Sequence, residues 1–96
     1  MKIYYVYILY CSDKTYYTGI TSNLTQRFVD YQRGMNKNSY TYSRRPLKIV
    51  FFCEFTDVNL AILSEKQIKK WSRVKKKALI NNQYEKLPNL AKKKFK

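Results

Sequence analysis

Apolar positions along the chain change their spacing several times, and each spacing predicts a different element. Residues 3–10 form an unbroken apolar and aromatic run rich in strand-forming side chains, and residues 47–55 predict a further strand. Because both faces of the first run are apolar, we expect a central strand covered on each side. A polar turn at 11–14 separates it from a strand at 15–20, and so short a link predicts an antiparallel hairpin.

Helical spacing appears in the remaining segments. Leu24, Phe28 and Tyr31 share one face and predict a helix that is capped by residues 21–23 and ends near Gly34. The polar residues 35–46 predict an exposed loop. A second helix, with Asp57 as its cap, is expected to have an inner face made of Ala61, Ile68 and Trp71. The same pattern continues in a third helix or an extension at Val74, Ala78 and Leu79.

The order strand, strand, helix, strand, helix, helix predicts an α+β fold with helices packed on a three-stranded antiparallel sheet. With 96 residues, 45% of them hydrophobic, we expect one domain at 1–90 and a basic tail at 91–96. Cys11 and Cys53 lack metal-ligand spacing and are expected to be reduced and packed as small hydrophobes. No membrane segment or cleavable leader is evident, so a cytoplasmic location is expected.

The formal charge of +14, from 20 Lys and Arg against 6 Asp and Glu, raises the question of a partner. Such an excess favours a polyanion, because binding one relieves repulsion and releases counterions, although a bias in composition also produces lysine-rich surfaces. We therefore expect a nucleic acid, read with weak sequence preference. The candidate contacts are Arg44 and Arg45 in the polar loop, and Lys69, Lys70 and Arg73 on the helices.

The residue types present exclude several kinds of active site. The chain has no histidine, which excludes Ser-His-Asp triads and histidine-based metal clusters. Gly19 and Gly34 are its two glycines, too few for a phosphate-binding glycine motif. Six scattered carboxylates do not predict a site built from several convergent acids. Tyrosine, arginine and one metal-ligating carboxylate remain as the available chemistry.

Five short segments in order resemble the GIY-YIG nuclease family. They are residues 5–9 (YVYIL), 17–19 (YTG), 24–28 (LTQRF), 43–50 (SRRPLKIV) and 65–71 (EKQIKKW). The resemblance covers roughly residues 3–90 and is greatest to small stand-alone bacterial members, related to the nuclease module of the excision-repair subunit UvrC. It implies a structure-selective endonuclease that hydrolyses phosphodiester bonds, in DNA rather than RNA, and a connection to DNA repair.

The resemblance also implies roles for individual residues. Tyr7 and Tyr17 correspond to the tyrosines of the two motifs, which line the site, and one of them helps to activate the attacking water. Arg27 corresponds to the arginine that holds the scissile phosphate, and Glu65 to the glutamate that ligates a single Mg²⁺ or Mn²⁺. Tyr31 stands where many relatives have histidine. The late site asparagine of the family has three candidates, Asn81, Asn82 and Asn89.

Ordinary structural explanations compete with these roles. Arg27 would otherwise cover apolar surface with its stem, and Glu65 would otherwise pair with Lys69 one turn along the helix. Glu65 nevertheless lies on the predicted inner face, where a carboxylate needs a partner and a metal ion would serve. Gly19 either permits close strand packing or leaves room for the phosphate.

Two other functions compete with a nuclease. One is a non-catalytic nucleic-acid-binding module with the same fold, acting with an unidentified protein partner, and the other is a basic protein-interaction domain. The presence together of Tyr7, Tyr17, Arg27 and Glu65 favours the nuclease, because a module that only binds needs no such set.

Overall fold

The computed structural model describes residues 2–81, and their elements follow the predicted order. The strands are β1 (Tyr4–Tyr10), β2 (Tyr16–Thr21) and β3 (Lys48–Phe55), and the helices are α1 (Leu24–Arg33), α2 (Val58–Lys70) and α3 (Arg73–Ile80). Both strand pairings are antiparallel in the order β2-β1-β3, which confirms the α+β fold and the central place of β1. The domain boundary expected at residue 90 lies outside the described residues. None of the helices between residues 2 and 81 is long and apolar enough to cross a bilayer.

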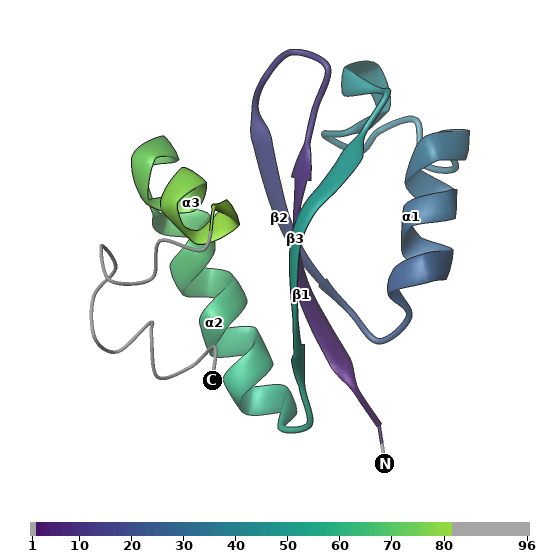
Figure 1. Cartoon of the computed structure of the whole chain (residues 1–96). Helices are drawn as coiled ribbons and strands as arrows, with labels where there is room; N and C mark the ends of the chain where they lie inside the picture. The colour runs from purple at the N-terminus through teal and green to yellow at the C-terminus, as the bar shows by residue number, and fades with distance from the viewer. Residues whose placement is uncertain (1, 82–96) are drawn as a thin grey trace.

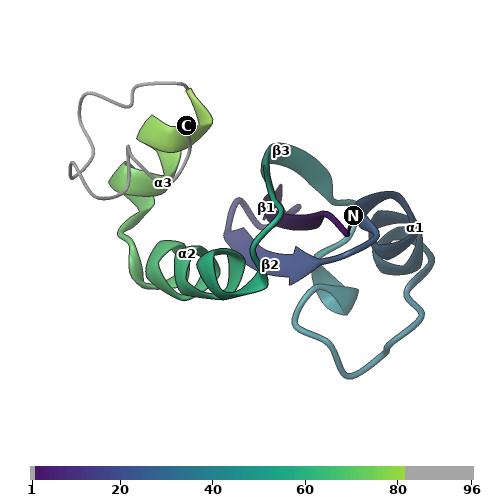
Figure 2. The ribbon, with the colours of Figure 1, turned by 90° about the horizontal axis from the view of Figure 1, so that it is seen from below.

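Strand alternation along β1 divides the core into two layers. Val6 and Ile8 are buried on one face of the sheet, and Tyr7 and Leu9 on the other. Figure 1 shows the sheet nearly edge-on, with α1 on one side and α2 and α3 on the opposite side. The view from below in Figure 2 again separates α1 from α3 across the strands. A strand with two apolar faces is thus covered on both, as its sequence predicted.

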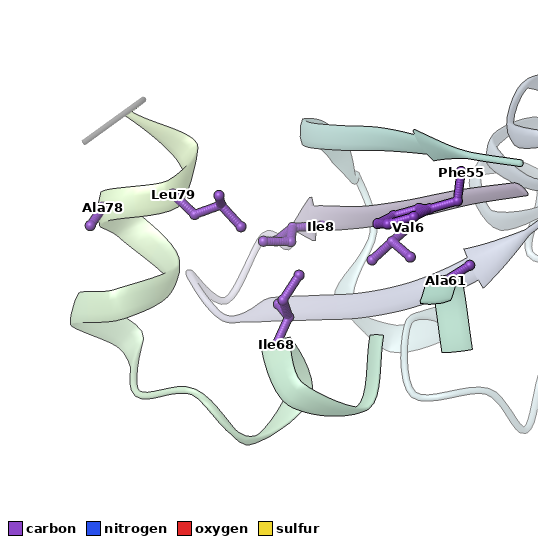
Figure 3. Close-up of a cluster of buried hydrophobic side chains, with 7 residues drawn as sticks. All are labelled: Val6, Ile8, Phe55, Ala61, Ile68, Ala78 and Leu79. Carbon is purple, nitrogen blue, oxygen red and sulfur yellow. The ribbon is translucent and has the colours of Figure 1, made fainter. Parts of the chain in front are cut away.

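Apolar side chains of the sheet, α2 and α3 cluster between these elements (Figure 3), and the polar side chains of Ser64 and Glu65 on α2 are buried as well. Ile68 of α2 and Leu79 of α3 are both buried there, with Ile8 of β1. Asp57 caps α2 as expected, since its carboxylate accepts hydrogen bonds from backbone N–H groups of the first turn. Val74 was predicted to face inward, but this was wrong, because it is 78% exposed. The helix stops at residue 70 and restarts at 73, so the apolar period of α2 does not carry over into α3.

The segment between α1 and β3 (residues 34–47, the α1–β3 loop) is more structured than the exposed loop we expected. Gly34 ends α1 in the left-handed conformation, with φ of 69°, as its position predicted. The loop contains a short 3-10 helix at Tyr42–Arg44, and Thr41 is 1% exposed. The amide of Gln32 accepts a hydrogen bond from the N–H of Leu47 at 3.1 Å and donates one to its carbonyl at 3.2 Å. Much of the polarity in this segment therefore serves contacts within the chain.

Candidate active site

Tyr7 lies at the centre of β1, directly across from Gly19 of β2. Its side chain is 1% exposed, and its ring lies over the glycine so closely that a Cβ atom there would be 2.5 Å from Tyr7 Cζ. No side chain tolerates that separation, so only glycine is compatible with this ring position. The space that Gly19 leaves is therefore taken by the Tyr7 ring, which favours the close-packing explanation of this glycine.

Three tyrosines from three elements meet on the α1 side of the sheet. The hydroxyl oxygens of Tyr7 and Tyr31 are 2.7 Å apart, and either group can be the donor. Tyr31 also meets the Tyr17 ring edge-on, with centroids 6.0 Å apart and planes at 76°. The phenol at position 31 thus joins the tyrosines of β1 and β2 from the helix.

Burial controls the ionisation of the two strand phenols. It raises the pKa of Tyr17 to about 12, with further contributions from Tyr31 and from the negative charge of Glu65. Burial also raises the pKa of Tyr7, as does its hydrogen bond to Tyr31. The positive charge of Arg27 lowers the pKa of both phenols without offsetting their burial. Both groups are therefore protonated at neutral pH and able to donate a hydrogen bond.

Arg27 and Glu65 belong to helices on opposite faces of the sheet, yet both act electrostatically on Tyr17. Arg27 is exposed on α1, and within residues 2–81 its guanidinium makes no hydrogen bond or ion pair. Glu65 is 8% exposed on α2, which confirms that it faces inward as its spacing predicted. Tyr17 therefore feels the charges of both Arg27 and Glu65, whereas Tyr7 feels that of Arg27.

Glu65 is a single carboxylate with one cationic neighbour. Lys69 Nζ lies 3.0 Å from Glu65 Oε2, so the ordinary ion pair considered from the sequence is present. The lysine side chain is 54% exposed and can leave the carboxylate at little cost. Ser64, next to Glu65, and Thr18, next to Tyr17, have buried hydroxyls without a hydrogen-bond partner among the described residues.

These donors fit one kind of metal site. Across residues 2–81 no three carboxylates or thiols come together, so a cage built entirely from protein ligands does not form there. Mg²⁺ commonly takes one or two carboxylates and completes its shell with water and substrate phosphate. The Glu65 carboxylate therefore fits a single hydrated divalent ion.

The arginines proposed as nucleic-acid contacts are engaged within the chain. Arg44 Nε donates to Asp13 Oδ2 at 2.9 Å, and Arg45 Nη1 donates to the Gln32 carbonyl at 3.2 Å. Arg73 lies over a tyrosine ring of β2 at 4.8 Å from its centroid. These three side chains connect the α1–β3 loop and α3 to the rest of the fold.

The remaining candidates are the lysines of α2 and the asparagines. Lys69 and Lys70 are both exposed in the last turn of α2. Asn81 is the C-cap of α3, whereas Asn82 and Asn89 lie outside the described residues. Tyr40 of the α1–β3 loop stacks on Tyr17. This contact was not predicted, because no motif distinguishes Tyr40 among the ten tyrosines of the sequence.

Comparison with known proteins identifies the family of the chain. The family model described as the GIY-YIG catalytic domain matches residues 3–78. A UPF0213 protein of Syntrophus aciditrophicus is 43% identical over 86% of this chain and 95% of its own length. One of Clostridium perfringens is 40% identical over 90% of this chain and 98% of its own. The solution NMR structure of a UPF0213 protein from Bacillus halodurans, 31% identical, superposes with a TM-score of 0.56 over 93% of this chain and 90% of that one. The chain therefore belongs to the GIY-YIG catalytic domain family, which is in general a family of nucleases.

Proposed function

We propose that the chain is a divalent-metal-dependent endonuclease that hydrolyses DNA phosphodiester bonds and selects its substrate by structure, with weak sequence preference. One observation carries the proposal: the free guanidinium of Arg27 and the buried carboxylate of Glu65 both act on the half-buried phenol of Tyr17, which lies beside the buried phenol of Tyr7. Covalent catalysis by thiols finds no support, since burial raises the pKa of both Cys11 and Cys53. Water is therefore the nucleophile we propose.

Each side chain has a role that follows from its surroundings. Arg27 has unused N–H donors in an exposed position, and a guanidinium holds phosphate oxygens in a bidentate manner. The protonated phenols of Tyr7 and Tyr17 donate hydrogen bonds that orient the water or a phosphate oxygen. Mg²⁺ or Mn²⁺ held by Glu65 would lower the pKa of a bound water and offset negative charge on phosphorus.

Binding of the substrate is proposed to depend on the basic surface. Lys69 and Lys70 are exposed and can contact the phosphate backbone directly. Arg44, Arg45 and Arg73 stay in the proposed set, because a guanidinium has five N–H donors and their contacts within the chain use some of them. Contacts of this kind track a backbone and do not read bases, which is why we propose selection by structure.

The proposal is tested by cleavage of nicked, flapped and branched DNA in Mg²⁺ or Mn²⁺ at low salt. Arg27→Gln and Glu65→Gln are compared with matched controls, Arg33→Gln on the same helix and Glu54→Gln on β3. We expect Arg27→Gln and Glu65→Gln to lose about 100-fold or more in kcat, as when a preorganised charge is removed from a transition state. The controls should stay within about twofold of the unaltered protein.

Other outcomes point elsewhere. A protein that binds these substrates at low salt but cuts none of them is the non-catalytic binding module that competes with this proposal. If Arg27→Gln and Glu65→Gln both cut as fast as the unaltered protein, the site lies elsewhere or the activity belongs to a contaminant. The same structures made of RNA decide between the two nucleic acids, and we expect cleavage of DNA.

A further inference from the structure

The ring of Tyr17 is held on two sides, and one of them belongs to the α1–β3 loop. Tyr31 meets its edge from α1, while Tyr40 stacks on its face with ring centroids 5.7 Å apart and planes at 20°. The guanidinium carbon of Arg44 lies 3.8 Å from the centroid of the Tyr40 ring. A guanidinium that close and a stacked ring cannot share one face, so Tyr40 is enclosed between Arg44 and Tyr17.

This stack is fastened to the turn of the β1–β2 hairpin. Arg44 Nε donates to Asp13 Oδ2 at 2.9 Å, and Arg44 Nη1 donates to the Tyr40 carbonyl at 2.7 Å. Thr15 Oγ1 donates to Asp13 Oδ1 at 2.6 Å and accepts a hydrogen bond from the Tyr40 hydroxyl at 3.2 Å. The backbone N–H of Ser12 donates to the Arg44 carbonyl at 2.9 Å. Contacts therefore run in a closed circuit from Tyr40 through Arg44, Asp13 and Thr15 back to Tyr40.

The same part of the loop is also fastened to α1. The neighbouring residue Arg45 donates through Nη1 to the Gln32 carbonyl at 3.2 Å and through Nε to the Tyr42 carbonyl at 2.9 Å. Its guanidinium carbon lies 4.4 Å from the centroid of the Tyr42 ring. Two consecutive arginines thus hold the loop to the two elements that carry Tyr17 and Tyr31.

We propose that Tyr40 and Arg44 are positioning residues for the reaction: they fix the plane of the Tyr17 ring and so the place of its hydroxyl. The inference rests on the proposed nuclease function. Tyr17 lies near the start of an edge strand, next to the hairpin turn, where an edge contact with Tyr31 alone leaves its ring free to tilt. Tyr40 is 44% exposed, but Tyr17 and Arg44 both lie against its ring, so a nucleobase would have to displace one of them to stack there.

The inference is tested by steady-state kinetics of Tyr40→Ala and Tyr40→Phe. Tyr42→Ala is the matched control, because Tyr42 lies in the same loop and its ring also packs against an arginine, but that arginine is Arg45 and not Arg44. We expect Tyr40→Ala to lower kcat by about 10- to 100-fold with KM changed less than about twofold, the pattern of a misplaced group and not of lost binding. Tyr40→Phe keeps the stack and should restore kcat, and Tyr42→Ala should leave it unchanged.

Two kinetic results would overturn the inference. A raised KM with unchanged kcat in Tyr40→Ala would make Tyr40 a substrate contact. Equal losses in Tyr40→Ala and Tyr42→Ala would mean that the loop acts only through general stability, which thermal unfolding of both variants would register.

A second measurement does not need activity. The ring signals of Tyr17, assigned with Tyr17→Phe in protein labelled at tyrosine with ¹³C, should shift in Tyr40→Ala and stay in place in Tyr42→Ala. If the unaltered protein cuts nothing, the proposed function fails by itself. Unchanged Tyr17 signals in Tyr40→Ala would then separately overturn the positioning contact, and a selective shift would support it.

Discussion

Replacing Gly19 by alanine is the smallest change that should disturb the site. The added Cβ atom would lie 2.5 Å from Tyr7 Cζ and 3.0 Å from Tyr7 Cε1. The ring cannot turn away freely, because Tyr7 is 1% exposed and packs with Leu9 and Leu47 in the layer beneath α1. Gly19→Ala should therefore push the phenol away from Tyr31, to which it is now hydrogen-bonded at 2.7 Å.

The expected magnitude combines three effects. Overpacking a closed site costs about 1–3 kcal/mol. Loss of the hydroxyl pair adds roughly 1 kcal/mol, and the lower conformational freedom of alanine in the unfolded chain returns about 0.4–1 kcal/mol. The net loss is then about 2 kcal/mol, which for a domain of this size lowers Tm by roughly 8–16 °C.

Thermal unfolding followed by circular dichroism measures this loss, and a double-mutant cycle identifies its cause. The hydroxyl of Tyr7 is among the atoms that the new methyl group would meet, so Gly19→Ala should cost less in a Tyr7→Phe background. A Tm within about 2 °C of the unaltered protein, or equal costs in the two backgrounds, would refute the idea that Gly19 exists to admit this ring.

Three further outcomes follow from the same cluster. Tyr31→Phe leaves the buried Tyr7 hydroxyl unpaired and should cost about 1–3 kcal/mol in urea unfolding. The pKa of Tyr17 in the folded protein, about 12, lies above its ordinary value near 10, so the native state keeps the phenol proton to higher pH. With EDTA present, the free energy of unfolding should not depend on this group below pH 10 and should fall between pH 10 and 12. Tyr17→Phe should reduce that fall. Lys69→Gln frees the Glu65 carboxylate and should tighten Mn²⁺ binding by about two- to fivefold in calorimetry.

Each of these outcomes has a result that contradicts it. Tyr31→Phe as stable as the unaltered protein would mean that water replaces the lost hydroxyl. An unchanged fall in stability above pH 10 in Tyr17→Phe would assign that fall to other groups. Weaker Mn²⁺ binding in Lys69→Gln would show that the lysine orients the Glu65 carboxylate instead of competing for it.

The hydrophobic pattern predicted the fold well because most of its information is local. The unbroken apolar run of β1 predicted a strand covered on both faces, helical spacing in α1 and α2 predicted the faces that pack on the sheet, and the ends of β1 and α1 agree with the prediction within one or two residues. The inward prediction for Val74 failed because a pattern of spacing assumes an unbroken helix, whereas Ser72 starts a new one with its own cap. The α1–β3 loop was misjudged for the opposite reason, since its polar groups bind one another and the hairpin turn.

The candidate site was predictable only in part. The order of the motifs predicted the site residues Tyr7, Tyr17, Arg27 and Glu65. Helical spacing by itself predicted that Glu65 faces inward, and it is buried in the structure. The contacts of Tyr40 were out of reach, because they join irregular segments whose approach depends on the finished fold. The direction of the phenol pKa shifts was also open, since the sequence shows an arginine nearby but not how deeply the rings are buried.

Net charge is a poor guide to which arginine would hold a phosphate in the proposed reaction. Arg44, Arg45 and Arg73 each contact another group of the chain through an N–H donor or a guanidinium face. Fewer of their N–H groups are therefore available to a phosphate. Arg27 is exposed and unpaired within residues 2–81, while its charge still acts on both buried phenols. An arginine that must receive a phosphate needs this combination, because a guanidinium already held by a carboxylate has to give up that partner first. Arg33 is also exposed and unpaired within residues 2–81, so a free guanidinium combined with electrostatic action on Tyr7 and Tyr17, visible only in the folded chain, distinguishes Arg27 more sharply than the charge of +14 does.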